Sequence, residues 1–404
     1  MVLNMSDSLS ILGQMIIYLF SDWVVLLGLA FFLVQTLGYV LLVTALAWTR
    51  SGKKLSVERE NVVPLKELPR FTIIIPAYNE EKNIEKKLTN AYSLKYPQYL
   101  LEVIVVDDGS TDETPTILEE LKRTRFPSLK VLRQKRTGKS SAQNLGLKDS
   151  VGEIVVISDA DTFLNPEALF YAASDFMDPS VGGVTCKVQS VNGYEVTNLN
   201  QKIAFFIKKK ENVIGSVLGM SGPFTAFRRP LIDRFDPSVY ACDMDVALLV
   251  RKAGFRVVCD DRIVGYLKPH GRDYKSVVRS IKHTFKGDIC MFLRHHDLLF
   301  TRRHGLSGSV MALQYLLLPL IAPLVFVFMM FYVVWKVLMG PFWSVFFAVA
   351  IFLLAFYLLM RKVARGSVVL QFLDLVFLRV VTYLTCFYVY FEYLKDRSGV
   401  WDTR

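Results

Sequence analysis

Two aspartates, Asp159 and Asp161, follow directly on an apolar run of four residues, Ile154 to Ile157. Consecutive Ile and Val residues bounded by polar ones predict a fully buried, parallel strand. The carboxyl end of such a strand borders the crevice in which open α/β sheets bind ligands. Two carboxylates one residue apart repel each other unless a cation lies between them, and hard oxygen ligands suit Mg²⁺ or Mn²⁺. The pair therefore predicts a metal site, with an Asp-rich strand-to-loop turn as the alternative.

Other polar segments stand at comparable places in an alternating pattern of strands and helices. Strands are predicted at residues 71–76, 101–106 and 129–133, and helices at 84–91, 115–122 and 140–148. The first strand runs into Ala77 to Glu80, the second runs into Asp107 to Thr111, and Arg136 to Lys139 precede the last helix. Such alternation predicts a parallel, doubly wound sheet, whose right-handed crossovers bring these segments to one edge.

In order, the segments PAYNE, DDGSTD, GK…N and DAD resemble the family 2 glycosyltransferases of the GT-A fold. The resemblance covers about residues 70–265, and it is specific because all four motifs occur in the family's order and at about its spacing. The flanking apolar runs are similar to those of the membrane-integrated polysaccharide synthases of this family, which include hyaluronan- and cellulose-synthase-like members. The resemblance implies an α/β GT-A cytosolic domain with a mainly parallel sheet, and helical transmembrane segments on both sides.

The resemblance also implies a site for a nucleotide-diphosphate sugar. Asp107 and Asp108 are expected to accept hydrogen bonds from the base or ribose, and Lys139 to face the diphosphate. Asp161, with Asp159 near the ribose or the metal, is expected to hold Mg²⁺ or Mn²⁺ against the leaving group. For Lys139 the alternative is a solvated lysine at a helix start. The other residues assigned to the nucleotide sugar are Pro76, Tyr78 and Glu80.

The acceptor side is expected in the second half of this region. The segment 221–229 is similar to the one that lines the acceptor region of these synthases, so the acceptor residues expected are Ser221, Gly222, Pro223 and Phe224. A loop before a basic helix start is the alternative. Asp243 aligns with the family's catalytic base, which takes the acceptor proton in an inverting displacement. Asp245 is expected to interact with the dipole at the N-terminus of the helix that carries both aspartates and is less suited to be the base. Cys242 replaces the acid that usually precedes the base.

The region before the C-terminal membrane segments departs from the processive members, which carry a QxxRW sequence there. Residues 278–288 contain neither Gln nor Trp, so processivity stays open. Arg279, Lys282 and His283 are assigned as diphosphate contacts, with a basic face near anionic headgroups as an equal alternative. Residues 271–305 are expected to form amphipathic interface helices.

Composition indicates a membrane protein. Hydrophobic residues make up 52% of the 404, and the mean hydropathy is +0.33. Residues 1–50 contain an apolar run from Trp23 to Trp48 that predicts a transmembrane helix. Runs at 310–338, 342–360 and 368–394 predict further helices within 306–395, before a tail of 396–404. The net charge of +11 is interpreted as positive cytoplasmic loops, and no nucleic-acid partner is expected. Five cysteines without CxxC spacing favour a reducing compartment.

The expected protein is therefore a multi-pass cell-membrane, inverting glycosyltransferase with a cytoplasmic catalytic domain over residues 70–270. The donor is expected to be a UDP-sugar, with a GDP-sugar as the alternative, and the acceptor a glycan or a polyprenyl or other lipid in the membrane. Two alternatives remain. One is a single-addition polyprenyl-phosphate glycosyltransferase, and the other is a non-catalytic transporter or scaffold with a degenerate transferase domain.

Overall fold

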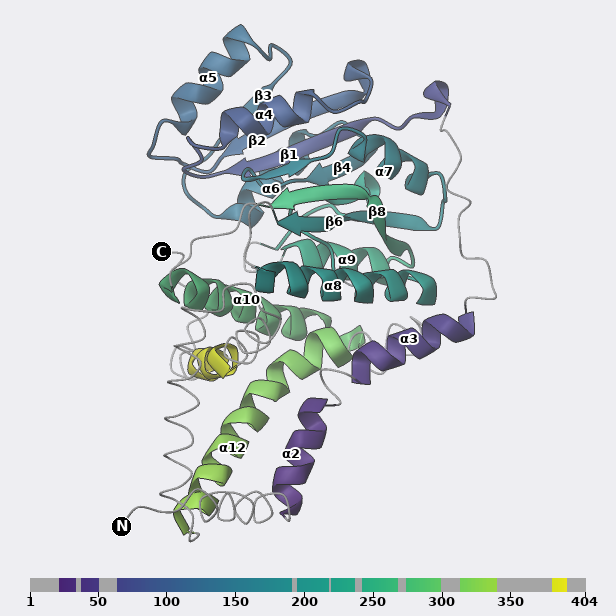
Figure 1. The fold of residues 1–404 in the computed structure, drawn as a ribbon. Coiled ribbons are helices and arrows are strands. Elements are labelled where there is room, and N and C mark those ends of the chain that lie inside the picture. Colours follow the sequence, from purple (N-terminus) through teal and green to yellow (C-terminus); the bar gives the residue numbers. More distant parts are fainter. Residues whose placement is uncertain are drawn as a thin grey trace. The chain divides into compact units, whose positions relative to one another are not determined.

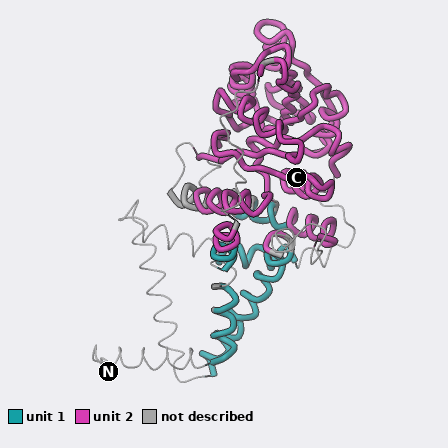
Figure 2. Tube along the Cα trace, turned by 90° about the vertical axis from the view of Figure 1, so that its right-hand side faces the viewer, with its two compact units in different colours: residues 1–42, 272–285, 317–399 teal, residues 43–271, 286–316, 400–404 magenta. Residues whose placement is uncertain are grey.

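A computed structural model describes residues 22–33, 38–50, 64–190, 195–217, 219–236, 242–267, 274–298, 313–339 and 380–390. The chain divides into two units (Figure 2). The sheet unit comprises residues 43–271, 286–316 and 400–404, and the helical unit comprises 1–42, 272–285 and 317–399. The expectations for residues 342–360 and 368–379 and for the tail, 396–404, lie outside the described residues.

The sheet unit contains one eight-stranded sheet in the order β3-β2-β1-β4-β7-β6-β8-β5 (Figure 1). Its strands are β1 (Phe71–Ala77), β2 (Leu101–Asp107), β3 (Lys130–Arg133), β4 (Ile154–Ile157), β5 (Thr162–Leu164), β6 (Val181–Ser190), β7 (Thr225–Arg228) and β8 (Arg256–Leu267). Its helices are α4 (Ile84–Tyr92), α5 (Thr114–Thr124), α6 (Lys139–Asp149), α7 (Ala168–Phe176), α8 (Glu195–Ile214) and α9 (Cys242–Lys252).

The first half of the sheet is parallel, as the alternation of strands and helices predicts. Strands β3, β2, β1 and β4 all run in the same direction. Ala77 at the end of β1 is opposite Asp107 at the end of β2, and Ile157 at the end of β4 is opposite Ile74. The polar segments that follow these strands therefore share one edge, which is where an open α/β sheet binds ligands.

The second half corrects the expectation of a mainly parallel sheet. Strand β7 lies antiparallel between β4 and β6, and β5 is antiparallel to β8. On a flat sheet β4 and β5 would be about 19 Å apart, because three strands separate them. The five residue steps from Ile157 to Thr162 reach at most about 17 Å. The sheet must therefore curl, and the segment that contains Asp159 and Asp161 connects β4 to β5 across it.

Both faces of the sheet are covered by helices. Successive residues of β1 point to opposite faces: Ile73 packs with Leu88 of α4 and Leu118 of α5, whereas Ile74 packs with Ala142 of α6. Helices α8 and α9 pack against β6 and β8 (Figure 1). Each of the four Ile and Val residues of β4 is buried. This explains why the strand reads as an uninterrupted apolar run.

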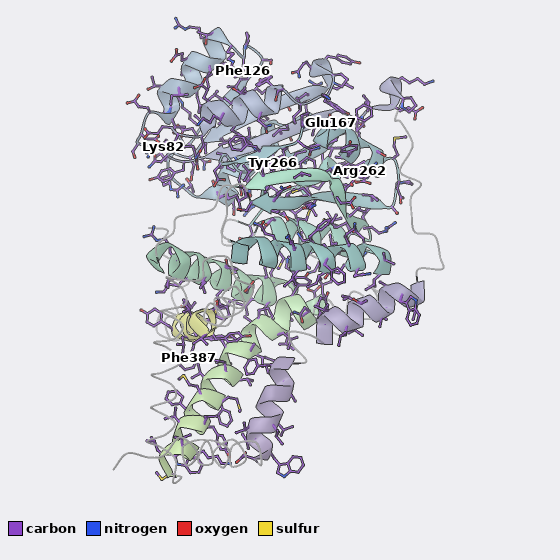
Figure 3. The ribbon with its side chains drawn as sticks, viewed as in Figure 1. Lys82, Phe126, Glu167, Arg262, Tyr266 and Phe387 are labelled. Atoms are coloured by element: carbon purple, nitrogen blue, oxygen red, sulfur yellow. The ribbon has the colours of Figure 1, made fainter. Side chains whose placement is uncertain are left out.

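Strand β8 has an irregularity in its middle and pairs with β6 on both sides of it. Cys186 of β6 is opposite Asp260, but the next residue, Lys187, is opposite Val264. Arg262 closes this bulge by donating from Nη2 to Asp260 Oδ2 at 2.7 Å, and Tyr266, further along the strand, pairs with β5 (Figure 3). The bulge bends β8 and lets it pair with both β6 and β5.

The predicted helix over 23–48 corresponds to two described helices. Helix α2 (Trp23–Leu33) ends before α3 (Tyr39–Arg50), whose first residues belong to this unit, and 34–37 are outside the described residues. Helix α12 (Leu318–Met339) packs against α2, and Asp22 accepts hydrogen bonds there from Tyr332 and Lys336. Among the residues that the structure describes, α12 alone is long and apolar enough to cross a membrane.

Candidate active site

One pocket of the sheet unit gathers most of the predicted donor-site residues at the common strand edge. It is lined by Pro76, Ala77, Tyr78, Glu80, Asp108, Arg136, Lys139, Asp159, Ala160 and Asp161. These residues come from the ends of β1, β2 and β4, from the start of α6 and from the loop before it. The parallel order of the first half of the sheet is what brings them together.

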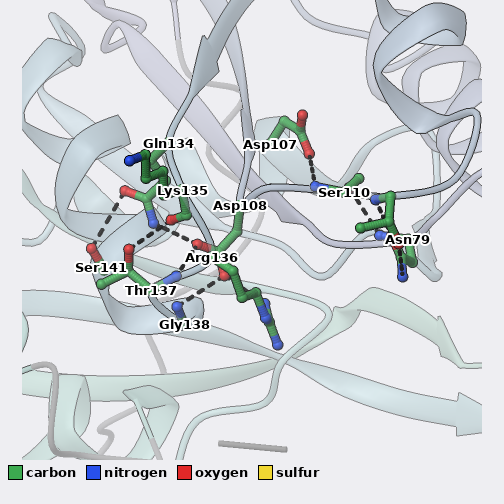
Figure 4. Close-up of polar contacts among 11 residues, drawn as sticks. Asn79, Asp107, Asp108, Ser110, Gln134, Lys135, Arg136, Thr137, Gly138 and Ser141 are labelled. Atoms are coloured by element: carbon green, nitrogen blue, oxygen red, sulfur yellow. Dashed lines mark hydrogen bonds and ion pairs between the residues drawn. The ribbon is translucent and has the colours of Figure 1, made fainter.

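Asp108 shapes the loop that leads into α6 (Figure 4). Its buried carboxylate accepts hydrogen bonds from Gln134 Nε2 at 2.7 Å and from the backbone N–H groups of Thr137 and Gly138, each at 2.9 Å. It also pairs with the Arg136 guanidinium. Gly138 has a φ of +106°, which favours glycine. Asp108 therefore positions the loop that presents Lys139.

The neighbouring aspartate is also buried. Asp107 Oδ1 accepts a hydrogen bond from the Ser110 backbone N–H at 3.0 Å, and Ser110 in turn receives one from the Asn79 N–H on its hydroxyl, also at 3.0 Å (Figure 4). This chain ties the loop after β2 to the loop after β1. The expected contacts of Asp107 and Asp108 with a base or ribose stay predictions.

Arg136 belongs to the site although the sequence did not single it out. Its guanidinium carbon lies 3.6 Å from the centroid of the Tyr78 ring, within the range of a cation–π interaction. Tyr78 keeps 38% of its surface exposed. The sequence signal for Arg136 was only its place three residues before Lys139, in a loop that also carries Arg133 and Lys135.

Asp159 and Asp161 both line the first pocket, and their role as metal ligands stays a prediction. Lys139 Nζ is 2.6 Å from Asp159 Oδ1. The pKa of Glu80 is raised above its usual range, first by burial and then by the negative charges of Asp161 and Asp159. Among the described residues, no three His, Cys, Asp or Glu side chains form a group that could hold a metal ion. Two carboxylates still fit Mg²⁺ or Mn²⁺, since such ions usually take their remaining ligands from water and substrate phosphates.

Asp243 lies in a second pocket that adjoins the first. This pocket is lined by Lys139, Gln143, Ile157, Asp159, Gly222, Thr225, Phe235, Asp243 and Val246, so Lys139 and Asp159 border both pockets. Burial raises the pKa of Asp243 above its usual range, and the positive charge of Lys139 opposes that shift. A carboxylate with a raised pKa is a better proton acceptor, as a general base must be.

Asp245, two residues after Asp243, binds side chains of α10 (Tyr274–His295). Its buried Oδ1 atom is 2.7 Å from His295 Nε2 and 3.3 Å from Arg294 Nε, both at the end of α10. Asp245 therefore holds α9 to the part of α10 that belongs to the sheet unit, a contact that goes beyond the expected helix-dipole role. This engagement leaves Asp243 as the aspartate of the turn that faces the pocket.

The predicted acceptor segment lies beside Asp159. The Asp159 N–H donates to Gly222 O at 3.3 Å, and Ser221 Oγ accepts from Lys208 Nζ at 2.8 Å. Phe224 is fully buried in the core, so its side chain supports the segment. Of the four residues expected to meet an acceptor, Gly222 is the one that lines the second pocket.

We expect Gly222→Ala to impair the site, because a Cβ there would stand 2.4 Å from Asp159 Oδ2. Asp159 would have to turn away from Lys139, and a displacement of about 1 Å in such a site costs about a hundredfold in rate. The rate of nucleotide release measures this. Gly219→Ala is the control, since a Cβ at 219 meets nothing within 4 Å. Equal rates in the two variants would contradict the close approach.

The three predicted diphosphate contacts lie outside the sheet unit. Arg279, Lys282 and His283 are on the first part of α10, within the helical unit, where Lys282 Nζ is 4.2 Å from the centroid of the Tyr388 ring. Their contact with a diphosphate stays a prediction.

Sequence reasoning missed Lys87, a fully buried lysine behind the metal aspartates. A signal was present, because Ile84, Lys87, Leu88 and Ala91 have the i, i+3, i+4, i+7 spacing of a buried helix face. A lysine on that stripe is unusual enough to be noticed.

The mixed sheet, with Asp159 and Asp161 after β4 and Asp243 in the adjoining pocket, has the arrangement expected of a GT-A type fold. Residues 72–235 match the model of the family described as Glycosyl transferase family 2. This segment, about two fifths of the chain, is similar to family 2 glycosyltransferase domains.

Curated relatives include polysaccharide synthases. A poly-beta-1,6-N-acetyl-D-glucosamine synthase from Staphylococcus aureus (strain COL) is 28% identical over 211 residues, which are 50% of each chain. Its counterpart from Staphylococcus epidermidis is 32% identical over 168 residues, which are 39% of each chain. The chain thus matches about half the length, or less, of these curated relatives.

A solved structure resembles nearly the whole chain. It is the mannosyltransferase PcManGT from Pyrobaculum calidifontis, in complex with GDP-Man and Mn²⁺. The TM-score is 0.66 at 23% identity, over 93% of this chain and 99% of that one. At this identity the likeness establishes the fold.

Proposed function

We propose that this protein is a membrane-bound, inverting glycosyltransferase that uses a nucleotide-diphosphate sugar and a divalent metal. The observation that carries the proposal is the pair of adjoining pockets, one with the two strand-end aspartates and the other with Asp243. Lys139 and Asp159 border both, so a sugar held between the pockets would have its diphosphate on one side and an acceptor on the other.

The reaction follows from the placement of charge. Asp243 takes the proton of an acceptor hydroxyl as its oxygen bonds to the anomeric carbon. The bond from that carbon to the diphosphate oxygen breaks on the opposite face, which inverts the configuration. Lys139 offsets the charge that develops on the departing nucleoside diphosphate. A Mg²⁺ or Mn²⁺ ion bound at Asp159 and Asp161 would supply further positive charge to the diphosphate.

The relatives suggest which donors to test first. Those from the two Staphylococcus species are named as N-acetylglucosamine polymer synthases, which supports a UDP-sugar donor and a growing glycan acceptor. The PcManGT complex with GDP-Man and Mn²⁺ puts a GDP-sugar second. Helix α12 supports a membrane location and an acceptor within or beside the bilayer.

The test is nucleotide release by the full chain, purified in detergent, with a panel of UDP- and GDP-sugars, Mg²⁺ or Mn²⁺, and added crude lipid or glycan. Release that needs one donor, one of the two metals and an acceptor is the expected result. A non-catalytic scaffold would show neither release nor thermal stabilisation by UDP or GDP with Mn²⁺, and that outcome would overturn the proposal. Transfer of a single sugar to polyprenyl phosphate would identify the alternative enzyme.

A further inference from the structure

Lys87 of α4 is buried directly behind the segment that carries Asp159 and Asp161. Its side chain is 1% exposed, yet it carries an ammonium group that normally remains in water. A buried cation costs stability unless hydrogen bonds and nearby negative charge compensate for its lost hydration. The surroundings of Lys87 supply both.

The hydrogen bonds of Lys87 bracket the metal aspartates. Lys87 Nζ donates to Ser158 Oγ at 2.6 Å and to the Thr162 carbonyl at 2.9 Å. These two residues stand immediately before and after Asp159–Asp161. The same helix holds the next strand, because Asn90 exchanges hydrogen bonds of 2.8 and 2.9 Å with the backbone of Leu164. Helix α4 therefore fixes the segment at both ends.

Ser158 extends this arrangement to the acceptor side. Its hydroxyl accepts from Lys87 and donates to the Pro223 carbonyl at 2.6 Å, and Ser158 is itself fully buried. Pro223 belongs to the segment that includes Gly222, whose carbonyl accepts from the Asp159 N–H at 3.3 Å. A continuous chain of hydrogen bonds thus joins Lys87 to the segments on both sides of the site.

The charge of Lys87 acts on the same aspartates. Burial lowers its pKa to about 8, against the opposing attraction of Asp159 and Asp161. Lys139 lies on the exposed side of Asp159, with its own side chain 48% exposed. The two aspartates are thus held between an exposed cation that a substrate can reach and a buried one that it cannot.

We propose that Lys87 is a positioning residue for sugar transfer. It holds Asp159 and Asp161 in place from behind and, through Ser158, couples the metal-side segment to the acceptor-side segment at Pro223. This inference rests on the proposed function and adds a residue that touches neither substrate nor metal.

The first test is amide hydrogen exchange in the metal-free protein, comparing Lys87→Met with wild type. Methionine keeps the length of the side chain and removes the charge and both hydrogen bonds. Exchange is expected to quicken about tenfold in residues 158–164 and 221–224 together, because a hydrogen bond to a charged group is lost. Lys86→Met is the matched control, since Lys86 is exposed on the same helix. Equal exchange in the two variants would overturn the proposal.

The second test uses Ser158→Ala, which removes the hydrogen bonds of Ser158 to Lys87 and to Pro223 but keeps the lysine and its hydrogen bond to the Thr162 carbonyl. We expect acceptor transfer to fall about tenfold relative to donor hydrolysis, while the half-saturating Mn²⁺ concentration stays near wild type. Lys87→Met is expected to change both quantities. Should Lys87→Met not fold, Ser158→Ala decides, and an unchanged ratio of transfer to hydrolysis would reject the coupling.

Failure of this inference differs from failure of the proposed function. A wild-type protein without nucleotide release would refute the function, whereas the exchange result on the metal-free protein would stand independently. A wild-type protein that transfers sugar, with variants at 87 and 158 that behave like Lys86→Met, would refute only the role of Lys87.

Discussion

Asp243→Asn is expected to reduce sugar transfer by a factor of about 10² to 10⁴, the usual contribution of a positioned general base. Asparagine has nearly the shape of aspartate but cannot take the acceptor proton. Asp243 lines the second pocket and is not one of the two aspartates predicted to hold the metal. Stabilisation of the protein by UDP or GDP with Mn²⁺ is therefore expected to remain.

The raised pKa of Asp243 adds an expectation for stability and for pH. Because its folded-state pKa lies above the unfolded value of about 3.9, the ionised carboxylate destabilises the fold at every pH above that value. Asp243→Asn removes this cost, so its Tm at pH 7 should equal or exceed that of wild type. In the wild type, kcat/KM should rise with pH through the raised pKa, because only the ionised base accepts a proton.

Initial rates across pH 4–8 and thermal melts at pH 7 test these expectations together. Asp233→Asn is the control, since Asp233 is exposed and lines neither pocket of the site. If both the Tm and the activity of Asp243→Asn fall, the substitution has damaged the fold. Activity retained in Asp243→Asn would assign the base to another residue.

Asp161→Asn is expected to abolish the metal-dependent part of nucleotide binding and to reduce transfer by about 10² or more, because a bound metal supplies several kcal/mol of charge stabilisation. Asp161 lines the donor pocket beside Asp159, and its charge helps to raise the pKa of Glu80. Losing one of two carboxylates removes half of the negative charge that the pair would offer a divalent ion, which weakens its binding.

The measurement is the shift in Tm on adding UDP or GDP, with and without Mn²⁺. Wild type should show a larger shift with Mn²⁺, and Asp161→Asn the same shift under both conditions. Asp149→Asn serves as the control, because Asp149 takes part in an exposed ion pair with Lys130 that contributes little to stability. A variant that keeps its Mn²⁺-dependent shift would remove Asp161 from the metal site.

Much of the donor side of the site was predictable from the sequence. Strands β1, β2 and β4 are short apolar runs, and the polar residues that follow them are adjacent in the chain to the strands that place them. In a parallel sheet the carboxyl ends of these strands lie at one edge, so the strand pattern alone is enough to predict that the residues come together. Asp108, Lys139, Asp159 and Asp161 line one pocket for this reason.

The second half of the sheet was not predictable in the same way. A short strand such as β7 has the same apolar pattern whether it pairs parallel or antiparallel, so the curl that brings β5 beside β8 has no local signal. The apolar run that contains α12 was recognisable by its length and hydropathy. Residues 34–37, between α2 and α3, lie outside the described residues, so one continuous helix over 23–48 stays a prediction.

The sequence by itself determined which groups follow the predicted strands: carboxylates and a lysine, in an order that resembles family 2 glycosyltransferases. Tertiary structure decided which of these groups face the pocket and which hold the framework. Asp245 is 50 residues from His295 in the chain, and Lys87 is 71 from Ser158. Hydrogen bonds over such separations depend on how helices pack on a curled sheet, and no periodicity within one element encodes that packing.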